Sequence, residues 1–365
     1  MNRLQRLHEA GVSIWLDTLS RELLETGAFA ALVDGSAVTG ATSNPTIFGK
    51  AITGSDRYDD QLRSLVASGV GEGRELFFAI ALDDVRAAAA ILRPAYEGSG
   101  GADGFVSFEC TPDVAGDAVA TIAQAVELWR RLDLPNVLIK VPATRAGVVA
   151  IEKLTALGVN VNVTLLFAVE RYEEVIEAYL RGLERRVVAG LPVRGISSVA
   201  SFFVSRIDAK ADAVLGADSA LRGHVAIANA QHAYASYLAR FAGPRWEALQ
   251  RAGASPQRPL WASTGTKDPS HSDVLYVERL IAPGVINTMP ENTLRAFADH
   301  GNVALTLAPD IGAARSVLSA AAAKGVDLDA ITSELERQGV QAFCDSYAEL
   351  LSCIEGKRDS LTAAA

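Results

Sequence analysis

Short apolar runs recur along the chain and alternate with longer segments whose apolar residues follow a helical spacing. The sequence has eight such runs, at residues 13–18, 38–44, 104–111, 137–144, 160–167, 195–203, 259–264 and 285–290. The clearest helical segments are residues 113–132, 145–157, 168–186 and 208–242. A helix between two strands is typical of parallel pairing through a helical crossover. This alternation predicts an α/β fold, a closed (β/α)8 TIM barrel.

The chain is longer than this barrel requires, because its 365 residues exceed the usual size of about 250. The surplus lies in two places, a helical insertion around residues 208–257 and additional C-terminal helices around residues 299–356. No linker or low-complexity segment divides the sequence. We therefore expect a single TIM-barrel domain over residues 1–365.

The composition excludes several other classes of protein. Hydrophobic residues make up 49% of the chain and charged residues 21%, which is too apolar for a disordered chain. The net charge of −9 argues against nucleic acid and anionic membranes as partners, since both attract basic surfaces. No apolar run approaches the roughly 20 residues of a membrane helix. Three scattered cysteines and no secretory signal predict a cytoplasmic protein.

Polar and apolar residues alternate within the predicted strands, which assigns them to opposite faces. Trp15 and Asp17 share one face of run 13–18, and Ser107 and Glu109 share one face of run 104–111. The opposite faces, expected to contact the helices, carry Ile14, Leu16, Val106, Phe108, Val161, Val163 and Leu165. Polar residues late in a strand therefore point into the barrel mouth, where the active sites of such barrels lie.

Lys140 is the most informative of these residues, because it lies late in the apolar run Val-Leu-Ile-Lys-Val-Pro at 137–142. Burial of an ammonium group costs desolvation free energy, which lowers its pKa and favours the neutral amine. A neutral lysine can attack a carbonyl carbon and form a Schiff base. A lysine that extends to solvent from the end of a strand fits the same run. This strand alone therefore does not decide between a Schiff-base lysine and a solvent-exposed one.

The residues on other strands favour the Schiff base. Asp17, Glu109 and Thr164 lie on polar faces, late in their strands, and supply the acid and base groups that such an aldolase needs. Asn44 and Asn162 can hydrogen-bond substrate hydroxyls. Each residue alone also fits a helix cap or a turn, and it is the set that indicates catalysis.

A phosphate site is indicated after the later strands. Arg206 follows the run 195–203, and Ser-Thr-Gly-Thr-Lys at 263–267 follows a strand. Loops after the seventh and eighth strands of this fold often bind phosphate. A solvated loop charge is the alternative for Arg206 or Lys267 alone. No histidine pair has the spacing of a metal site, so we expect no metal.

Five motifs resemble those of the transaldolase family. They are Ser-Ile-Trp-Leu-Asp at 13–17, Thr-Ser-Asn-Pro-Thr at 42–46, Val-Ser-Phe-Glu at 106–109, Ile-Lys-Val-Pro-Ala-Thr at 139–144 and Asn-Val-Asn-Val-Thr-Leu-Leu-Phe at 160–167. Their order matches the family from the first strand to the eighth. The chain length and the loop Trp-Ala-Ser-Thr-Gly-Thr-Lys at 261–267 resemble the bacterial subgroup with an extended chain.

The resemblance implies a role for each matching residue. Lys140 would form the Schiff base, and Asp17 would take the hydroxyl proton during cleavage and return it on addition. Glu109, Thr164 and a bound water would serve dehydration and hydrolysis. The implied substrate-binding residues are Asn44, Asn162 and Ser201 for hydroxyls, Phe203 for the wall, and Arg206, Ser263 and Lys267 for the phosphate. Two positions depart from the family, Lys267 for an arginine and Ser205 for a glycine.

The activity implied is transfer of a dihydroxyacetone group between sedoheptulose 7-phosphate and glyceraldehyde 3-phosphate, in the non-oxidative pentose phosphate pathway. The products would be erythrose 4-phosphate and fructose 6-phosphate. We expect no metal or organic cofactor, phosphorylated sugars as partners, and a monomer or homodimer. Two alternatives remain, a fructose 6-phosphate aldolase and a non-catalytic barrel that binds sugar phosphates. Glu109 and the chain length argue against the first, and the lysine with two carboxylates argues against the second.

Overall fold

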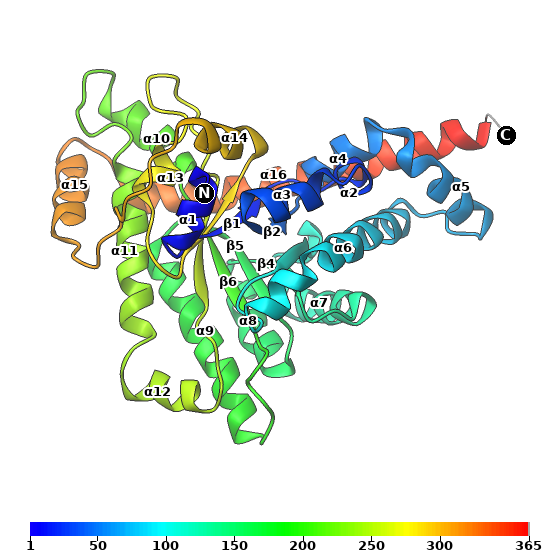
Figure 1. Ribbon diagram of the computed structural model, residues 1–365, viewed down its shortest axis with the longest axis horizontal. Coiled ribbons are helices and arrows are strands. Elements are labelled where there is room, and N and C mark those ends of the chain that lie inside the picture. Colours follow the sequence, from blue (N-terminus) through cyan, green and yellow to red (C-terminus); the bar gives the residue numbers. More distant parts are fainter. Residues whose placement is uncertain (364–365) are drawn as a thin grey trace.

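The computed structural model describes residues 1–363 and contains a closed barrel of eight parallel strands (Figure 1). The strands are β1 (Ser13–Leu16), β2 (Val38–Thr42), β3 (Phe105–Glu109), β4 (Val137–Pro142), β5 (Val161–Leu166), β6 (Ser198–Phe203), β7 (Arg258–Ala262) and β8 (Ile286–Met289). Each strand pairs with the next, and β8 pairs with β1 to close the barrel. The predicted (β/α)8 fold class is confirmed.

Helices surround the barrel and connect its strands. Before β6 they are α1 (Arg3–Glu9), α2 (Arg21–Glu25), α3 (Ala28–Ser36), α4 (Pro45–Thr53), α5 (Asp59–Ala67), α6 (Gly73–Gly98), α7 (Ala118–Leu132), α8 (Arg145–Leu157) and α9 (Val169–Val188). After β6 they are α10 (Ser205–Leu215), α11 (Val225–Arg240), α12 (Gly243–Arg251), α13 (Leu275–Arg279), α14 (Glu291–His300), α15 (Gly312–Ala323) and α16 (Leu328–Ala363). Two short 3-10 helices are η1 (Asp56–Tyr58) and η2 (Pro112–Val114).

Residues 208–242, which share one helical pattern in the sequence, form two helices. Helix α10 ends at Leu215, Gly216 follows with a positive φ of 78°, and α11 begins at Val225. Glycine adopts this backbone conformation without the steric cost that other residues meet. The expected single domain over 1–365 includes residues 364–365, which lie outside the described range, and its extent stays a prediction.

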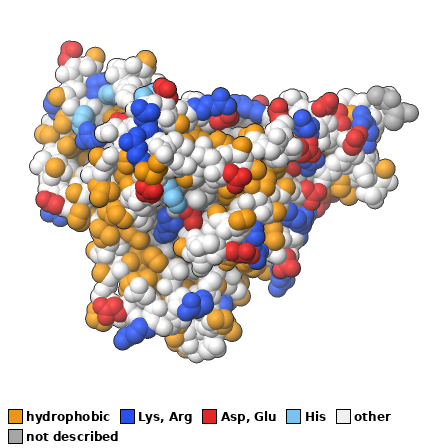
Figure 2. Space-filling model, viewed as in Figure 1, with side chains coloured by type: hydrophobic (Ala, Val, Ile, Leu, Met, Phe, Trp, Pro, Cys, Tyr) orange, Lys and Arg blue, Asp and Glu red, His pale blue; other side chains and the backbone are white. Residues whose placement is uncertain are grey.

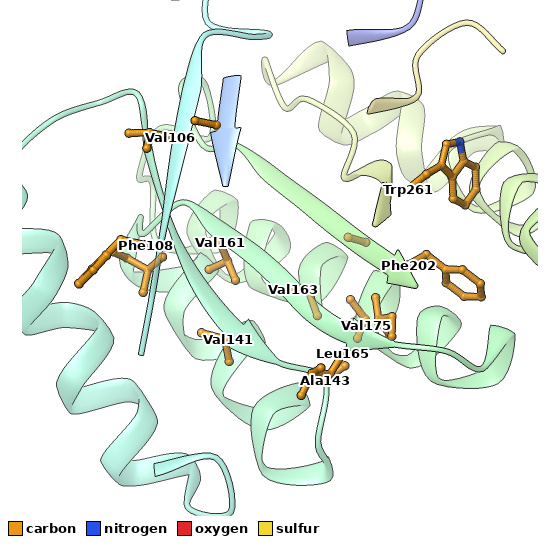
Figure 3. Close-up of a cluster of buried hydrophobic side chains, with 14 of the residues drawn as sticks. Val106, Phe108, Val141, Ala143, Val161, Val163, Leu165, Val175, Phe202 and Trp261 are labelled. Carbon is orange, nitrogen blue, oxygen red and sulfur yellow. The ribbon is translucent and has the colours of Figure 1, made fainter. Parts of the chain in front are cut away.

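Because side chains alternate along each strand, the barrel has two apolar regions, one between the strands and the helices and one inside the barrel. Side chains on the outer face, including Val106, Phe108, Val141, Val161 and Val163, contribute to the main hydrophobic core (Figure 3). The inner face fills the barrel with a second cluster, made by Trp15, Phe105, Leu138, Val199, Leu260, Ala262 and Ile286. Gly40 makes room for this filling, since a Cβ there would lie 2.5 Å from the Trp15 indole. The polar residues that follow on the same face therefore lie above an apolar floor.

Polar groups close the opposite end of the barrel around the buried carboxylate of Asp103. Its oxygens accept hydrogen bonds from Trp15 Nε1 (2.9 Å), Thr39 Oγ1 (2.8 Å) and the Ser13 hydroxyl. The guanidinium of Arg258 donates to the same Ser13 hydroxyl (2.7 Å). These contacts tie β1 to β2, to β7 and to the segment before β3.

Charge is spread over the outer surface. Figure 2 shows acidic and basic side chains interspersed on one face of the molecule. Among the described residues, no helix is both long and apolar enough to cross a membrane.

Replacement of Asp103 should destabilise the barrel. The change Asp103→Asn places an amide NH2 against groups that are themselves donors, and we expect a loss of about 2–3 kcal/mol in the free energy of unfolding. Urea unfolding followed by circular dichroism measures it. Asp60→Asn is the control, because the Asp60 side chain is fully exposed. Equal stability of the two variants would contradict the role of Asp103.

Candidate active site

A cleft of about 560 Å³ opens at the carboxyl ends of the strands. Ten of the eleven predicted site residues line it: Asp17, Asn44, Glu109, Lys140, Thr164, Ser201, Phe203, Arg206, Ser263 and Lys267. Its size falls within the usual range for small-molecule sites, about 300–1,000 Å³. The structure therefore brings together residues that are up to 250 positions apart in the sequence.

Lys140 and Glu109 form an ion pair at the centre of the cleft. They lie directly opposite each other in the β3–β4 pairing, so the strand register alone makes them neighbours. Lys140 Nζ also donates a hydrogen bond to the carbonyl oxygen of Ser43 (3.0 Å), and its side chain is only 9% exposed. The second carboxylate oxygen of Glu109 is buried and accepts no hydrogen bond from the described residues. That oxygen is available to a substrate group or a water.

Burial raises the pKa of the Glu109 carboxyl above its ordinary value, and the nearby charge of Asp17 adds to this shift. The contact with Lys140 opposes it. A raised pKa brings a carboxyl closer to the pH at which it can both take and give a proton. Glu109 therefore has the position and the environment of a general acid and base.

Asp17 lies one residue after β1 and faces the same space. Its Oδ1 accepts a hydrogen bond from Thr42 Oγ1 (2.7 Å), and Thr42 Oγ1 lies 2.8 Å from Thr288 Oγ1. Burial raises the pKa of Asp17, whereas Lys140, Thr42 and Arg206 lower it. The cleft thus holds two desolvated carboxyl groups and one lysine, which is the arrangement of paired acid and base groups.

Asn162 is the predicted site residue that does not line the cleft. It is fully buried beneath it, where Nδ2 donates to Ser107 Oγ (2.9 Å) and Oδ1 accepts from Ser201 Oγ (2.7 Å). Ser201 does line the cleft. The structure therefore places Asn162 where it orients Ser201, and its direct contact with a substrate stays a prediction.

Asn44 caps α4. Its side-chain oxygen accepts a hydrogen bond from the backbone N–H of Ile47 (3.0 Å), as an N-cap residue does. The sequence pattern suggested either a turn residue or a substrate ligand. The cap uses the amide oxygen and leaves the NH2 group for a ligand in the cleft.

Two cations lie on the β6–β7 side of the cleft. Arg206 is in the first turn of α10, with its guanidinium 5.3 Å from the centroid of the Phe203 ring. Burial lowers the pKa of Lys267, and the charge of Arg206 lowers it further. Two like charges in one desolvated corner favour an anion between them. Ser263 completes the corner, with Oγ 3.0 Å from Ser205 Oγ.

Several cleft residues were not predicted from the sequence. Thr42 and Thr288 follow the polar alternation of their strands, a signal that could have identified them. Gly339, Ala342, Phe343 and Ser346 come from α16, which carries no motif. Leu165 was expected on the outer face. It belongs to the main hydrophobic core and also lines the cleft, where its φ of 58° interrupts the alternation of β5.

Outside the cleft, Asp212, Asp268 and His271 are close enough to hold a metal ion in principle. Both carboxylates already have donors, since Gly223 N donates to Asp212 (3.1 Å) and Arg222 Nη2 donates to Asp268 (2.5 Å). We therefore assign the cluster a structural role. It ties the loop that carries Lys267 to the segment before α11.

The buried Asp208 beside this cluster provides a pH test. Its oxygens accept from Ala226 N (2.8 Å) and Tyr276 Oη (3.0 Å), and burial raises its pKa to about 6 from 3.8. The folded state thus holds this proton more tightly, so the contribution of Asp208 to stability falls as pH rises from about 4 to about 6.

Asp208→Asn should remove this loss. We expect the stability of the variant relative to wild type to increase by about 3 kcal/mol between pH 4 and pH 7. Urea unfolding at a series of pH values measures the difference. A difference that stays constant over this range would contradict the inferred burial cost.

Comparisons with known proteins identify the family of this chain. The family model of Transaldolase/Fructose-6-phosphate aldolase matches residues 14–354. A protein named Transaldolase from Frankia alni is 52% identical over 359 residues, covering 97% of this chain and 96% of its own. Proteins of the same name from Acidothermus cellulolyticus (49%, covering 96% and 95%) and Mycolicibacterium smegmatis (47%, covering 98% and 98%) are also similar. The chain therefore belongs to the transaldolase/fructose-6-phosphate aldolase family.

Proposed function

We propose that this chain is a transaldolase that transfers a dihydroxyacetone group through a Schiff base on Lys140. The observation that carries this is the contact between Lys140 and Glu109 with Asp17 in the same cleft. Relatives at about 50% identity named Transaldolase support the activity. With sedoheptulose 7-phosphate as the donor, the acceptor would be glyceraldehyde 3-phosphate. In the reverse direction the donor would be fructose 6-phosphate and the acceptor erythrose 4-phosphate.

Imine formation would use Lys140 and Glu109. The amine attacks the C2 carbonyl of the ketose, and the carbinolamine must then lose water. Glu109 lies close enough to Nζ to move protons in these steps, and its raised pKa fits both directions of transfer. Thr164, on the neighbouring strand, would help to hold the water that leaves and returns.

Carbon–carbon cleavage would use Asp17. The carboxylate takes the proton of the C4 hydroxyl, the C3–C4 bond breaks, and the electron pair moves into the iminium. The aldose phosphate leaves and an enamine remains on Lys140. Because the protonated imine accepts the electrons, we propose that the reaction needs no metal or organic cofactor. Addition to the next aldehyde reverses these steps, and Asp17 returns the proton.

Arg206 and Lys267 would hold the phosphate at the far end of the sugar. The net charge of −9 does not oppose this, since both cations lie in the cleft with Lys140. A charge-assisted hydrogen bond to a phosphate is about twice as strong as a neutral one.

Trapping of the imine tests the mechanism. Incubation with fructose 6-phosphate and borohydride should add one reduced dihydroxyacetone unit to the wild type, because borohydride reduces the imine to a stable amine. Lys140→Ala should show no adduct by mass spectrometry. Lys153→Ala, a change at an exposed lysine on α8, should be labelled normally. An adduct on Lys140→Ala would contradict the assignment. Turnover that needs no acceptor aldehyde would favour the aldolase alternative.

Loss of Lys267 tests the phosphate site. Lys267→Ala should raise KM for fructose 6-phosphate by about 10- to 100-fold, the equivalent of one charge-assisted hydrogen bond. Activity with unphosphorylated fructose should not change, and steady-state kinetics on both sugars measures the two effects. An equal loss with both sugars would assign Lys267 to the reacting end instead.

We also propose where the protein is located and how it assembles. Cys110, Cys344 and Cys353 are free, which supports a reducing compartment such as the cytoplasm. We propose a monomer or homodimer with no nucleic-acid or membrane partner.

A further inference from the structure

Helix α16 crosses the mouth of the barrel and closes one side of the cleft (Figure 1). Near its start, Glu334 pairs with Lys210 of α10 (2.9 Å). Near its end, Lys357 pairs with Asp59 of α5 (2.7 Å). Its cleft-lining residues are Gly339, Ala342, Phe343 and Ser346, a spacing that lies on one helical face.

The strand beneath this helix is irregular beside the proposed reaction centre. Between β5 and β6 the register shifts, so that Val163 pairs with Ala200 but Leu166 pairs with Phe202. One extra residue is therefore accommodated in β5, as in a β-bulge, which commonly redirects a side chain next to an active site. Leu165 has a φ of 58°, which is rare for a bulky residue. As a result Thr164 and Leu165 both line the cleft.

Gly339 is fitted to this redirected side chain. A Cβ at position 339 would lie 2.9 Å from Leu165 Cδ2, closer than real Cβ contacts allow. A side chain at this position would therefore require the Leu165 side chain to shift. Leu165 packs in the main hydrophobic core and is 8% exposed, although it lines a large cleft.

We propose that Leu165 and Gly339 form an apolar closure beside Thr164 that limits water at the enamine, and so determine whether the group is transferred or released. This inference rests on the proposed transaldolase function. In release, a proton from water or a neighbouring acid adds to the enamine carbon and regenerates the iminium. Water then adds to C2, the C2–N bond breaks, and free dihydroxyacetone leaves with the amine of Lys140 restored. Transfer consumes the same enamine without this water.

The ratio of dihydroxyacetone release to transfer tests the closure. Leu165→Asn replaces the apolar side chain with a polar amide. Asparagine is chosen because it tolerates the positive φ at this position. Gly339→Ala displaces Leu165 from the opposite side. We expect each change to raise the ratio by about tenfold, the scale on which one misfitted methyl group acts. Release is measured with fructose 6-phosphate alone, and transfer with an added aldose phosphate.

The matched control is Gly356→Ala on the same helix, because that position is exposed and a Cβ there meets no atom within 4 Å. Its ratio should equal that of the wild type. In the background of Leu165→Ala, Gly339→Ala should have no further effect, since the Cβ then has room.

Ratios equal to wild type in both Leu165→Asn and Gly339→Ala would overturn the closure, whatever the total activity. A raised ratio in Gly356→Ala would overturn it too, because it would indicate a general loosening of α16. Failure of the proposed function would appear differently. The wild type itself would then neither trap an imine nor transfer the group.

Discussion

The closed barrel is the constraint on which the rest of the structure depends. Eight parallel strands point their carboxyl ends to one rim, and the period of two sends alternate side chains inward. Lys140 and Glu109 meet because the β3–β4 register places them opposite each other. The apolar filling around Trp15 supports this polar layer from below. The geometry of the site is therefore a property of the sheet, and no flexible loop has to bring these two residues together.

Burial of opposite charges in one cleft gives the site its electrostatic character. Asp17 and Glu109 are desolvated, which raises the pKa of each, and Lys140 opposes both shifts. Arg206 and Lys267 are also desolvated, in a separate corner, which lowers the pKa of each. An acidic protein thus has, within one cleft, a cationic corner and a separate pair of desolvated carboxyl groups beside a lysine, which supports the proposed binding of a ketose phosphate.

Much of this was predictable from the sequence, since local patterns carry it. The eight strands, the inward face of Asp17 and Glu109, and the position of Lys140 follow from alternation within short runs. The alternation does not predict how deeply Asn162 is buried. The alternation predicts that the Asn162 side chain points into the barrel. Its position below the cleft depends on hydrogen bonds with Ser107 and Ser201 on neighbouring strands. The exact point at which α10 ends and α11 begins does not follow from the sequence, because both segments share one helical pattern.

The sequence by itself determined the barrel, the order of its strands and the chemistry at their ends, because these depend on residues close together in the chain. The tertiary structure alone decided the bulge at Leu165 and the course of α16 over the mouth. Both involve segments that are separate in the sequence, β5 with β6 in the bulge and α16 with Leu165 at the mouth. No periodicity within either segment encodes such a contact. It depends on where the closed barrel leaves space for the last helix.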